Sequence, residues 1–280
     1  MGSPVEKDGR FAFSNLVPGN YAVRARLGGS NGLVQAPPSE AGFVAVRVDA
    51  ADIDGLVISM AKPIDVAGRI VLDDPTASFT VATGWSPPFL MARLATDKGP
   101  GFGSNSTAHP DDKRSFKFQG LFGYRLIEVV NVPRGWYVKS IRYRGKDVID
   151  TPTDFGASSD PAELEIIMSN RGAVLTGRVT DDAGNPVRGA RVLVLSTNPD
   201  RWTELSAYSA GRRATSSADG SYRLGPQREG DYFVAALPSV ADEPPAGDRE
   251  QLTRIAGMAE RVTLAPDEKR SLDLRVIKPE

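Results

Sequence analysis

The sequence predicts an all-β fold built from tandem seven-strand Greek-key β-sandwiches. Two observations predict it. The 280 residues include 28 Gly and 21 Pro, a turn content that suits many short strands better than long helices. A turn-and-strand motif also occurs three times. Its aromatic residues Phe11, Phe116 and Tyr222 stand about 105 residues apart, close to the roughly 100 residues of one β-sandwich domain.

The motif is clearest near the start of the chain. Asp8-Gly9 supplies a tight turn, because Gly accepts positive φ and Asp bonds back to the local backbone. Phe11 and Phe13 then alternate with polar or small residues, as in a strand with one buried face. Pro18-Gly19 makes the next turn, and Tyr21 begins a second alternating segment. We therefore expect each copy to form a β-hairpin.

The other two copies repeat this pattern with different fidelity. The last copy reads Asp219-Gly220-Ser221-Tyr222 and then Gly230-Asp231-Tyr232. A weaker middle copy reads Arg114-Ser115-Phe116 and then Gly123-Tyr124, without the Pro-Gly turn.

A second pair of segments supports the same period. Gly68-Arg69-Ile70-Val71 and Gly177-Arg178-Val179-Thr180 each lead into a pair of aspartates, and we expect both to be the opening strands of their units. The first copy has no such strand before it. The predicted boundaries are therefore a partial unit at 1–62, a degenerate unit at 63–169 and a complete unit at 170–280. We expect the partial unit to expose a sheet edge and to unfold most easily.

The remaining elements follow from periodicity. Three further alternating segments predict strands, and their inward residues are Val44, Val46 and Val48; Leu56, Ile58 and Met60; and Leu272, Leu274 and Val276. One short surface helix is predicted near 248–258, with Asp248 as its N-cap and Leu252, Ile255 and Ala256 on one face.

These motifs resemble a known family. The Gly177-Arg178-Val179 strand, the Asp219-Gly220-Ser221-Tyr222 turn and the Gly230-Asp231-Tyr232 segment look like a carboxypeptidase regulatory-like domain. That family has a transthyretin-like (prealbumin-like) sandwich and is related to collagen-adhesin B-type repeats. The segment Gln227-Arg228-Glu229-Gly230 departs from the usual Leu-Pro-Pro-Gly. A finer similarity, through 133–141, Gly145-Lys146-Asp147-Val148, Trp202 and Arg212-Arg213, is to tandem modules at the C-termini of large secreted bacterial proteins, notably of acidobacteria.

The resemblance implies a non-catalytic role as an accessory, spacer or adhesive module of a larger exported bacterial protein. It also implies a secreted, periplasmic or cell-surface location and partners among neighbouring domains or extracellular molecules. The N-terminus does not look like a signal peptide. The formal net charge of −1 and the lack of a basic stripe argue against nucleic-acid binding. No apolar run is long enough to span a bilayer.

The sequence shows no pattern typical of a catalytic site. His109 is the one histidine, and it lies in a polar loop without a nucleophile motif. Without cysteine or a second histidine, a zinc site of the usual kind is excluded. The acidic turns, such as Asp73-Asp74 and Asp181-Asp182, do not follow a calcium-loop spacing, although Ca²⁺ binding there stays an alternative. We therefore expect no enzyme activity, no cofactor and no metal.

Candidate ligand-binding residues are aromatic or basic and lie in loop-like segments. They are Trp85, Phe89, Trp202, Arg212 and Arg213. Exposed aromatic faces can stack on sugar rings, so a polysaccharide-binding module is the alternative function. Arg212 and Arg213 could instead pair with acids of a neighbouring unit. Trp136 alternates with Val138 and is expected in the core.

Overall fold

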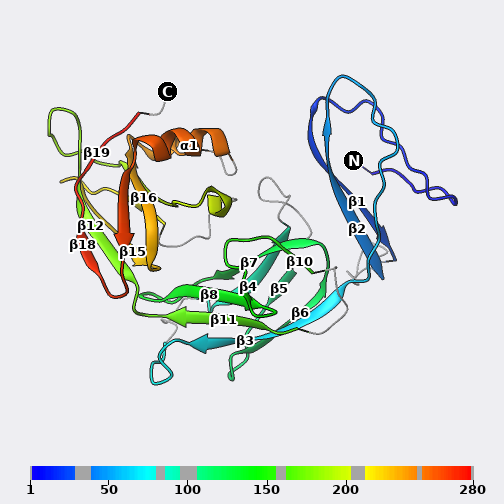
Figure 1. Cartoon of the computed structure of the whole chain (residues 1–280), viewed down its shortest axis with the longest axis horizontal. Helices are drawn as coiled ribbons and strands as arrows, with labels where there is room; N and C mark the ends of the chain where they lie inside the picture. Colours follow the sequence, from blue (N-terminus) through cyan, green and yellow to red (C-terminus); the bar gives the residue numbers. More distant parts are fainter. Residues whose placement is uncertain are drawn as a thin grey trace.

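The computed structural model describes residues 2–28, 39–79, 86–94, 106–155, 162–202, 212–244 and 248–278. These residues form an all-β structure of several sheets with one α-helix, which confirms the predicted fold class (Figure 1). We name its parts the N-terminal region (2–63), the middle sandwich (64–169) and the C-terminal sandwich (173–278).

The strands and helices have the following bounds. The N-terminal region holds β1 (Gly19–Leu27) and β2 (Glu40–Val48). The middle sandwich holds β3 (Ile64–Leu72), β4 (Phe89–Leu94), β5 (Ser106–Ala108), β6 (Ser115–Leu121), β7 (Tyr124–Val130), β8 (Tyr137–Tyr143), β9 (Lys146–Asp147), β10 (Thr153–Asp154) and β11 (Leu164–Ser169). The C-terminal sandwich holds β12 (Ala173–Thr180), β13 (Arg191–Ser196), β14 (Arg213–Thr215), β15 (Ser221–Gln227), β16 (Gly230–Leu237), α1 (Arg249–Met258), β17 (Glu260–Leu264), β18 (Lys269–Ser271) and β19 (Leu274–Arg275), with short 3-10 turns at Pro199–Trp202 and Val240–Asp242.

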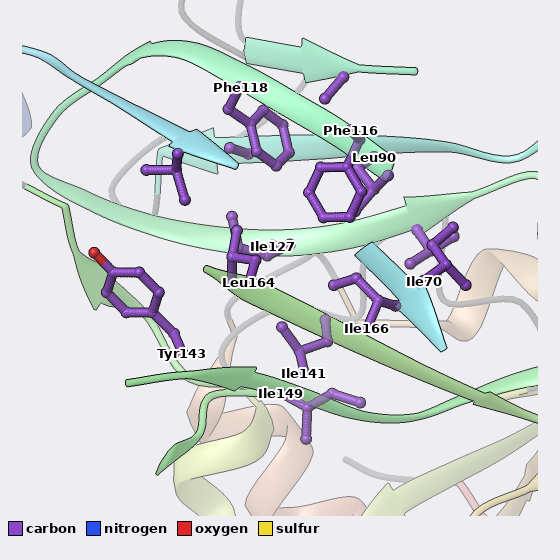
Figure 2. Close-up of a cluster of buried hydrophobic side chains, with 14 of the residues drawn as sticks. Ile70, Leu90, Phe116, Phe118, Ile127, Ile141, Tyr143, Ile149, Leu164 and Ile166 are labelled. Atoms are coloured by element: carbon purple, nitrogen blue, oxygen red, sulfur yellow. The ribbon is translucent and has the colours of Figure 1, made fainter. Parts of the chain in front are cut away.

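The middle sandwich packs two sheets face to face. One has the strand order β10-β7-β4-β5 and the other β6-β3-β11-β8-β9. Alternating residues of both sheets point inward and form one buried cluster, as the period of two predicts. Figure 2 shows Phe116 and Phe118 of β6 in one cluster with Leu90 and Ile127 of the facing sheet and Leu164 of β11. Trp136 joins this core, as expected.

The C-terminal sandwich repeats this topology except for β8 and β9, which have no counterpart in it. Its sheets have the orders β15-β12-β18 and β14-β13-β16-β17, which match β6-β3-β11 and β5-β4-β7-β10 of the middle sandwich. The Gly-Arg segments form strands β3 and β12, as predicted, and both strands lie between two others in their sheets. Helix α1 also lies where expected, and the Asp248 carboxylate accepts a 3.0 Å hydrogen bond from the Gln251 N–H. Leu252 and Ile255 bury its inner face.

The prediction of a hairpin in each copy is wrong. Strands β15 and β16 follow one another in sequence, but they belong to opposite sheets. β15 pairs with β12, whereas β16 pairs with β13 and β17. The connecting turn therefore carries the chain across the sandwich. Alternation identified both segments as strands, but alternation does not identify the partner of a strand.

The N-terminal region contains a single strand pair, in which β1 and β2 run antiparallel from Gly19 opposite Val48 to Leu27 opposite Glu40. The strand of Val44, Val46 and Val48 is confirmed. Strands through Phe11–Phe13 and through Leu56–Met60 were also predicted, and neither segment is a regular strand. Within the described residues, neither segment has a hydrogen-bonded neighbour that would hold it extended in a ladder; the bridge between Ala61 and Ala41 begins just after the second.

Burial in the N-terminal region is shallow. Among the described residues, none of this region belongs to a buried hydrophobic cluster. Val17 is 71% and Val57 76% exposed. The hairpin does contact the middle sandwich, because the Phe43 ring lies so close to Gly123 that a Cβ there would meet it at 2.5 Å.

Candidate functional site

The candidate site is a pocket of about 260 Å³ between the middle and C-terminal sandwiches. The middle sandwich lines it with β7, the Pro133–Trp136 turn and the start of β8. The C-terminal sandwich lines it with Arg212, the segment from Gly225 to Arg228, and Tyr232. Apolar and aromatic side chains form most of its wall, and a small set of charged groups faces them.

Three charged residues bridge the two sandwiches in this pocket. The Arg212 Nη2 donates to the Asp150 Oδ2 at 2.6 Å, and the Arg228 Nη2 donates to the same oxygen. The Asp150 side chain is 22% exposed, and those of Arg212 and Arg228 are 18% and 14% exposed. We call Asp150, Arg212 and Arg228 the junction clamp. It joins one carboxylate of the middle sandwich to two guanidinium groups of the C-terminal sandwich.

Local backbone structure positions each member of the clamp. Asp150 follows β9 in a turn with φ of 58°, a left-handed conformation that Asp tolerates better than most residues. Arg212 immediately precedes β14, and its carbonyl accepts a hydrogen bond from the Val194 N–H of β13. Arg228 lies in the tight turn between β15 and β16. Asp150 and Arg228 therefore lie in turns whose positions are fixed by the paired strands on either side of them.

The electrostatics of the clamp favour its charged state. Burial by itself would raise the pKa of Asp150, but the guanidinium groups of Arg212 and Arg228 hold that pKa below its ordinary value of 3.8. Asp150 is therefore ionised at neutral pH. Burial raises the pKa of the neighbouring Tyr232, so its phenol stays neutral. With two cations and one anion, the clamp itself carries a net positive charge.

The connection between the sandwiches is short and closely packed. Only Asn170, Arg171 and Gly172 separate β11 from β12. A Cβ on Gly172 would lie 2.4 Å from Pro226 and 3.0 Å from the Tyr137 ring, so no larger residue fits without displacement. The Arg171 Nε also donates to Asp267 at 2.7 Å. The junction is thus a packed interface and contains more than the ion pairs of the clamp.

The chemistry of the pocket does not resemble a catalytic site. The described residues that line it include no serine, threonine, cysteine, histidine or lysine. Its two carboxylates are each held by arginine, Asp150 by the clamp and Glu128 by Arg93 at 3.1 Å. General acid catalysis needs a proton donor, and Asp150 has a lowered pKa that disfavours its protonated form. The arrangement can hold two surfaces together or accept an anionic group.

Trp202 does not lie where the sequence suggested. We expected an exposed loop aromatic, but Trp202 is 5% exposed in a cluster with Leu195, Leu237 and Leu252. Its Nε1 donates to the Ser196 carbonyl at 2.6 Å. The short 3-10 turn at Pro199–Trp202 folds the side chain back under α1. It offers no face on which a sugar ring could stack.

The other predicted ligand residues are dispersed. Arg212 pairs with an acid of the neighbouring sandwich, whereas Arg213 forms an ion pair with Glu243 within its own sandwich. Phe89 is half-buried, and its ring stacks on the exposed His109 at a centroid distance of 5.5 Å. Trp85 lies outside the described residues. Of the four predicted ligand residues that the structure describes, only Arg212 lines the pocket.

Sequence reasoning missed Asp150 and Arg228 as functional residues. Asp150 was one acid among many, and its partner Arg228 is far along the chain in the other sandwich. One signal could have found Arg228. It stands where the segment Gln227-Arg228-Glu229-Gly230 departs from the Leu-Pro-Pro-Gly of the resembled family. A turn proline replaced by arginine indicates a side chain with a specific contact.

Two further features bear on the site. Within the described residues, no group of three or more His, Cys, Asp or Glu side chains is arranged to hold a metal ion. No helix in the described part of the chain is long and apolar enough to cross a membrane.

Comparison with known proteins yields only distant structural similarity. No family model matches the chain. No curated protein matches it either. Among solved structures, the minor pilin of the Gram-positive pathogen Streptococcus agalactiae is similar over 77% of this chain and 98% of its own, with 11% identity and a TM-score of 0.29. BcpA, the major pilin subunit of Bacillus cereus, is similar over 92% of this chain and 99% of its own, with 9% identity and a TM-score of 0.27.

The Bacillus anthracis TIE protein is similar over 97% of this chain, with 11% identity and a TM-score of 0.25, and the chain spans about half of that protein, 48%. Similarity this low says nothing about function. The more specific resemblance to carboxypeptidase regulatory-like domains stays a prediction, since no family model supports it.

Proposed function

We propose that the chain is a non-catalytic structural and interaction module, in which tandem β-sandwich units hold neighbouring parts of a larger exported bacterial protein at a fixed spacing. Its units end near residues 62 and 169. Its partners are adjoining domains or a cell-surface assembly.

The observation that carries this proposal is the junction clamp. A carboxylate between two guanidinium groups, with all three side chains largely buried, restrains the angle between the two sandwiches. The three-residue connection and the packing of Gly172 against Pro226 and Tyr137 act in the same direction. Domains joined by long polar linkers move independently, whereas a short and packed junction makes a stiff spacer.

Distance measurements between the sandwiches test the proposal. The chain contains no cysteine, so cysteines at the exposed positions Lys113 and Ala183 can carry a specific pair of spin labels or dyes. We expect one narrow distance distribution for this labelled chain. Asp150→Ala should broaden it, because the removal leaves two buried guanidinium groups uncompensated and repelling.

A matched control separates the clamp from a general loss of charge. Glu250→Ala removes an exposed ion pair with Arg254 on α1, far from the junction, and should leave the distribution narrow. A broad distribution in the unsubstituted chain would overturn the proposal. A distribution that stays narrow in a folded Asp150→Ala variant would show that the clamp does not set the spacing.

A further inference from the structure

One turn occurs in all three parts of the molecule with the same hydrogen bonds. The first residue of the turn donates its N–H to the carbonyl four residues later, and a residue with positive φ donates back to the first. In the N-terminal region, the Glu6 N–H donates to the Arg10 carbonyl at 2.8 Å and the Gly9 N–H to the Glu6 carbonyl at 3.0 Å. In the middle sandwich, the Asp111 N–H donates to the Ser115 carbonyl and the Arg114 N–H to the Asp111 carbonyl, both at 2.8 Å. In the C-terminal sandwich, the Ser217 N–H donates to the Ser221 carbonyl at 2.9 Å and the Gly220 N–H to the Ser217 carbonyl at 3.0 Å. The same bonds also close the turn from Asp181 to Asn185, so the equivalence of Gly9, Arg114 and Gly220 rests in addition on the aromatic residue two positions later, Phe11, Phe116 or Tyr222.

In the two complete sandwiches, the opening strand binds this turn. The Gly220 carbonyl accepts a hydrogen bond from the Val179 N–H of β12 at 2.8 Å. The Arg114 carbonyl accepts the equivalent bond from the Ile70 N–H of β3, also at 2.8 Å. β15 and β6 then continue along these opening strands. In the N-terminal region the equivalent acceptor is the Gly9 carbonyl, and no described residue donates to it.

The other side of the opening strand has an equivalent segment as well. β11 runs parallel to β3 with Leu164 opposite Gly68, and the Leu272 carbonyl lies against Gly177 of β12. Leu56 corresponds to Leu272, because it follows Val48 by the same eight residues that separate Leu272 from Leu264. Val48 and Leu264 are themselves equivalent, since they pair with Gly19 and Gly230.

Both segments that would flank an opening strand are thus present in the N-terminal region, and both are irregular. Residues 10–13 and 53–58 carry alternating apolar side chains that β6, β15 and β11 bury in the other sandwiches. Here Phe11, Phe13, Leu56 and Ile58 are only half-buried, and Val57 is exposed. Within the described residues, the backbone groups of 11–13 and 53–58 have no hydrogen-bond partner. Backbone groups of this kind beside apolar side chains are the features that β-augmentation uses.

We propose that the N-terminal region has a vacant strand position between residues 10–13 and 53–58, and that it binds an extended peptide segment of the opening-strand type, apolar-x-Gly-Arg-apolar. The segment would run antiparallel to 10–13 and parallel to 53–58, as β12 runs relative to β15 and β18. This inference does not depend on the junction clamp.

The central glycine of the segment follows from the aromatic residue opposite it. Gly68 pairs with Phe116 and Gly177 with Tyr222. A Cβ on Gly68 would lie 2.4 Å from the Phe116 ring and 2.5 Å from the Leu164 carbonyl. A Cβ on Gly177 would lie 2.0 Å from the Leu272 carbonyl. The N-terminal region presents Phe11 and Leu56 at these positions, so the occupant needs glycine there as well.

The arginine after this glycine is included because both opening strands of this chain carry Gly-Arg and because the flanking segment is acidic. Between residues 49 and 61 the chain carries Asp49, Asp52 and Asp54 and no basic residue. Asp52 and Asp54 are exposed and form no ion pair within the described residues. In the middle sandwich the arginine after glycine, Arg69, pairs with Glu165 of the flanking strand at 3.0 Å, whereas Val57 stands at the equivalent position of the N-terminal region, so the same ion pair would not form there.

Peptide binding to the full chain tests the proposal. The probe is a labelled peptide with the sequence of residues 171–182, and the matched control is the same peptide with Gly177→Val. We expect saturable binding of the first peptide and at least about tenfold weaker binding of the control, measured by fluorescence anisotropy. Hydrogen exchange should slow at residues 10–13 and 53–58 when the peptide binds, and it should not change at residues 221–224.

A protein variant tests the predicted register. Phe11→Ala removes the ring that excludes a side chain, so it should narrow the difference in affinity between the two peptides. Equal binding of both peptides to the unsubstituted chain would overturn the proposal, as would no binding of either at about 1 mM peptide. Slower hydrogen exchange in the C-terminal sandwich alone would also overturn it, because the peptide would then have replaced β12 there and not bound the N-terminal region.

Discussion

The N-terminal region and the C-terminal sandwich share local structure but differ in their cores. Both contain the same turn, and both pair their next strand antiparallel, Tyr21 opposite Val46 in one and Tyr232 opposite Val262 in the other. Tyr232 is 7% exposed inside a buried cluster, whereas Tyr21 is half-buried and belongs to none.

The difference between the two regions lies in one strand. β12 pairs with β15 on one side and with β18 and β19 on the other, so it completes a sheet that covers β13 and β16. Where no such strand lies between the flanking segments, both are irregular and their apolar residues stay accessible. Local turn chemistry is therefore sufficient to form the turn and the adjacent strand pair, but a central strand is needed to bury a core.

The largest expected effect tests this comparison with one substitution at equivalent positions. Tyr232→Ala should lower the free energy of unfolding of the C-terminal sandwich by about 4 kcal/mol, because it removes a buried aromatic ring from a closed core. Tyr21→Ala should cost about 1 kcal/mol or less, because the ring is already half in solvent. Urea denaturation measures the first effect and hydrogen exchange of β1 and β2 the second. Equal costs would contradict the comparison.

The next effect concerns the opening strand itself. Gly177→Val should destabilise the C-terminal sandwich by about 3 kcal/mol, since its side chain must displace the Leu272 carbonyl and the Tyr222 ring. Gly257→Ala in α1 serves as the control, because nothing lies within 4 Å of a Cβ there. That change should be neutral or slightly stabilising. If Gly177→Val leaves the free energy of unfolding unchanged, the lack of a side chain at residue 177 is not what allows β12 to pack against the Tyr222 ring.

A smaller effect belongs to the junction. Asp150→Asn should lower stability at neutral pH by about 2 kcal/mol, less than for a fully buried pair because its side chains are partly exposed. The folded-state pKa of Asp150 is lowered, so its contribution is present above the ordinary pKa of 3.8 and is lost as the pH falls through the folded-state pKa. The difference between variant and unsubstituted chain should therefore disappear in acid. Urea denaturation at both pH values measures it, and a constant difference would contradict the assignment.

The smallest effect is local to α1. Asp248→Ala removes the cap that accepts from the Gln251 N–H and should cost about 1 kcal/mol. Glu250→Ala on the same helix should change stability by less than about 0.5 kcal/mol, because its ion pair with Arg254 is exposed. Thermal unfolding of both variants tests the difference. Equal losses of stability in the two variants would mean that the hydrogen bond accepted by the Asp248 carboxylate contributes nothing beyond the negative charge of the side chain.

Much of the fold could be predicted from turn residues and alternation. The Gly-Arg segments became β3 and β12, and Asp248 caps α1. Strand partners could not be predicted, because a period of two reports which face is buried and not which strand lies alongside. For the same reason, the alternating residues Leu56, Ile58 and Met60 read as a strand, although no described strand pairs with that segment.

Less of the candidate site could be predicted. Arg212 was singled out as a possible partner of an acid in another unit, and it binds Asp150. Nothing in the sequence relates Asp150 to Arg228, because their contact exists only once two sandwiches have folded and docked. Trp202 was misjudged because its segment contains Asn and Pro, which indicate a turn but do not report whether the side chain folds back beneath the neighbouring helix.

The parallel pairing of first and last strands has a mechanical consequence. In the middle sandwich, β3 and β11 lie side by side in parallel, as do β12 and β19 in the C-terminal sandwich. A pull on the two ends of either sandwich therefore loads several hydrogen bonds in shear at the same time, so they must break together. The β1–β2 hairpin instead opens one bond after another from its ends. Under tension, single-molecule extension should show two strong rupture events and little resistance from residues 2–63.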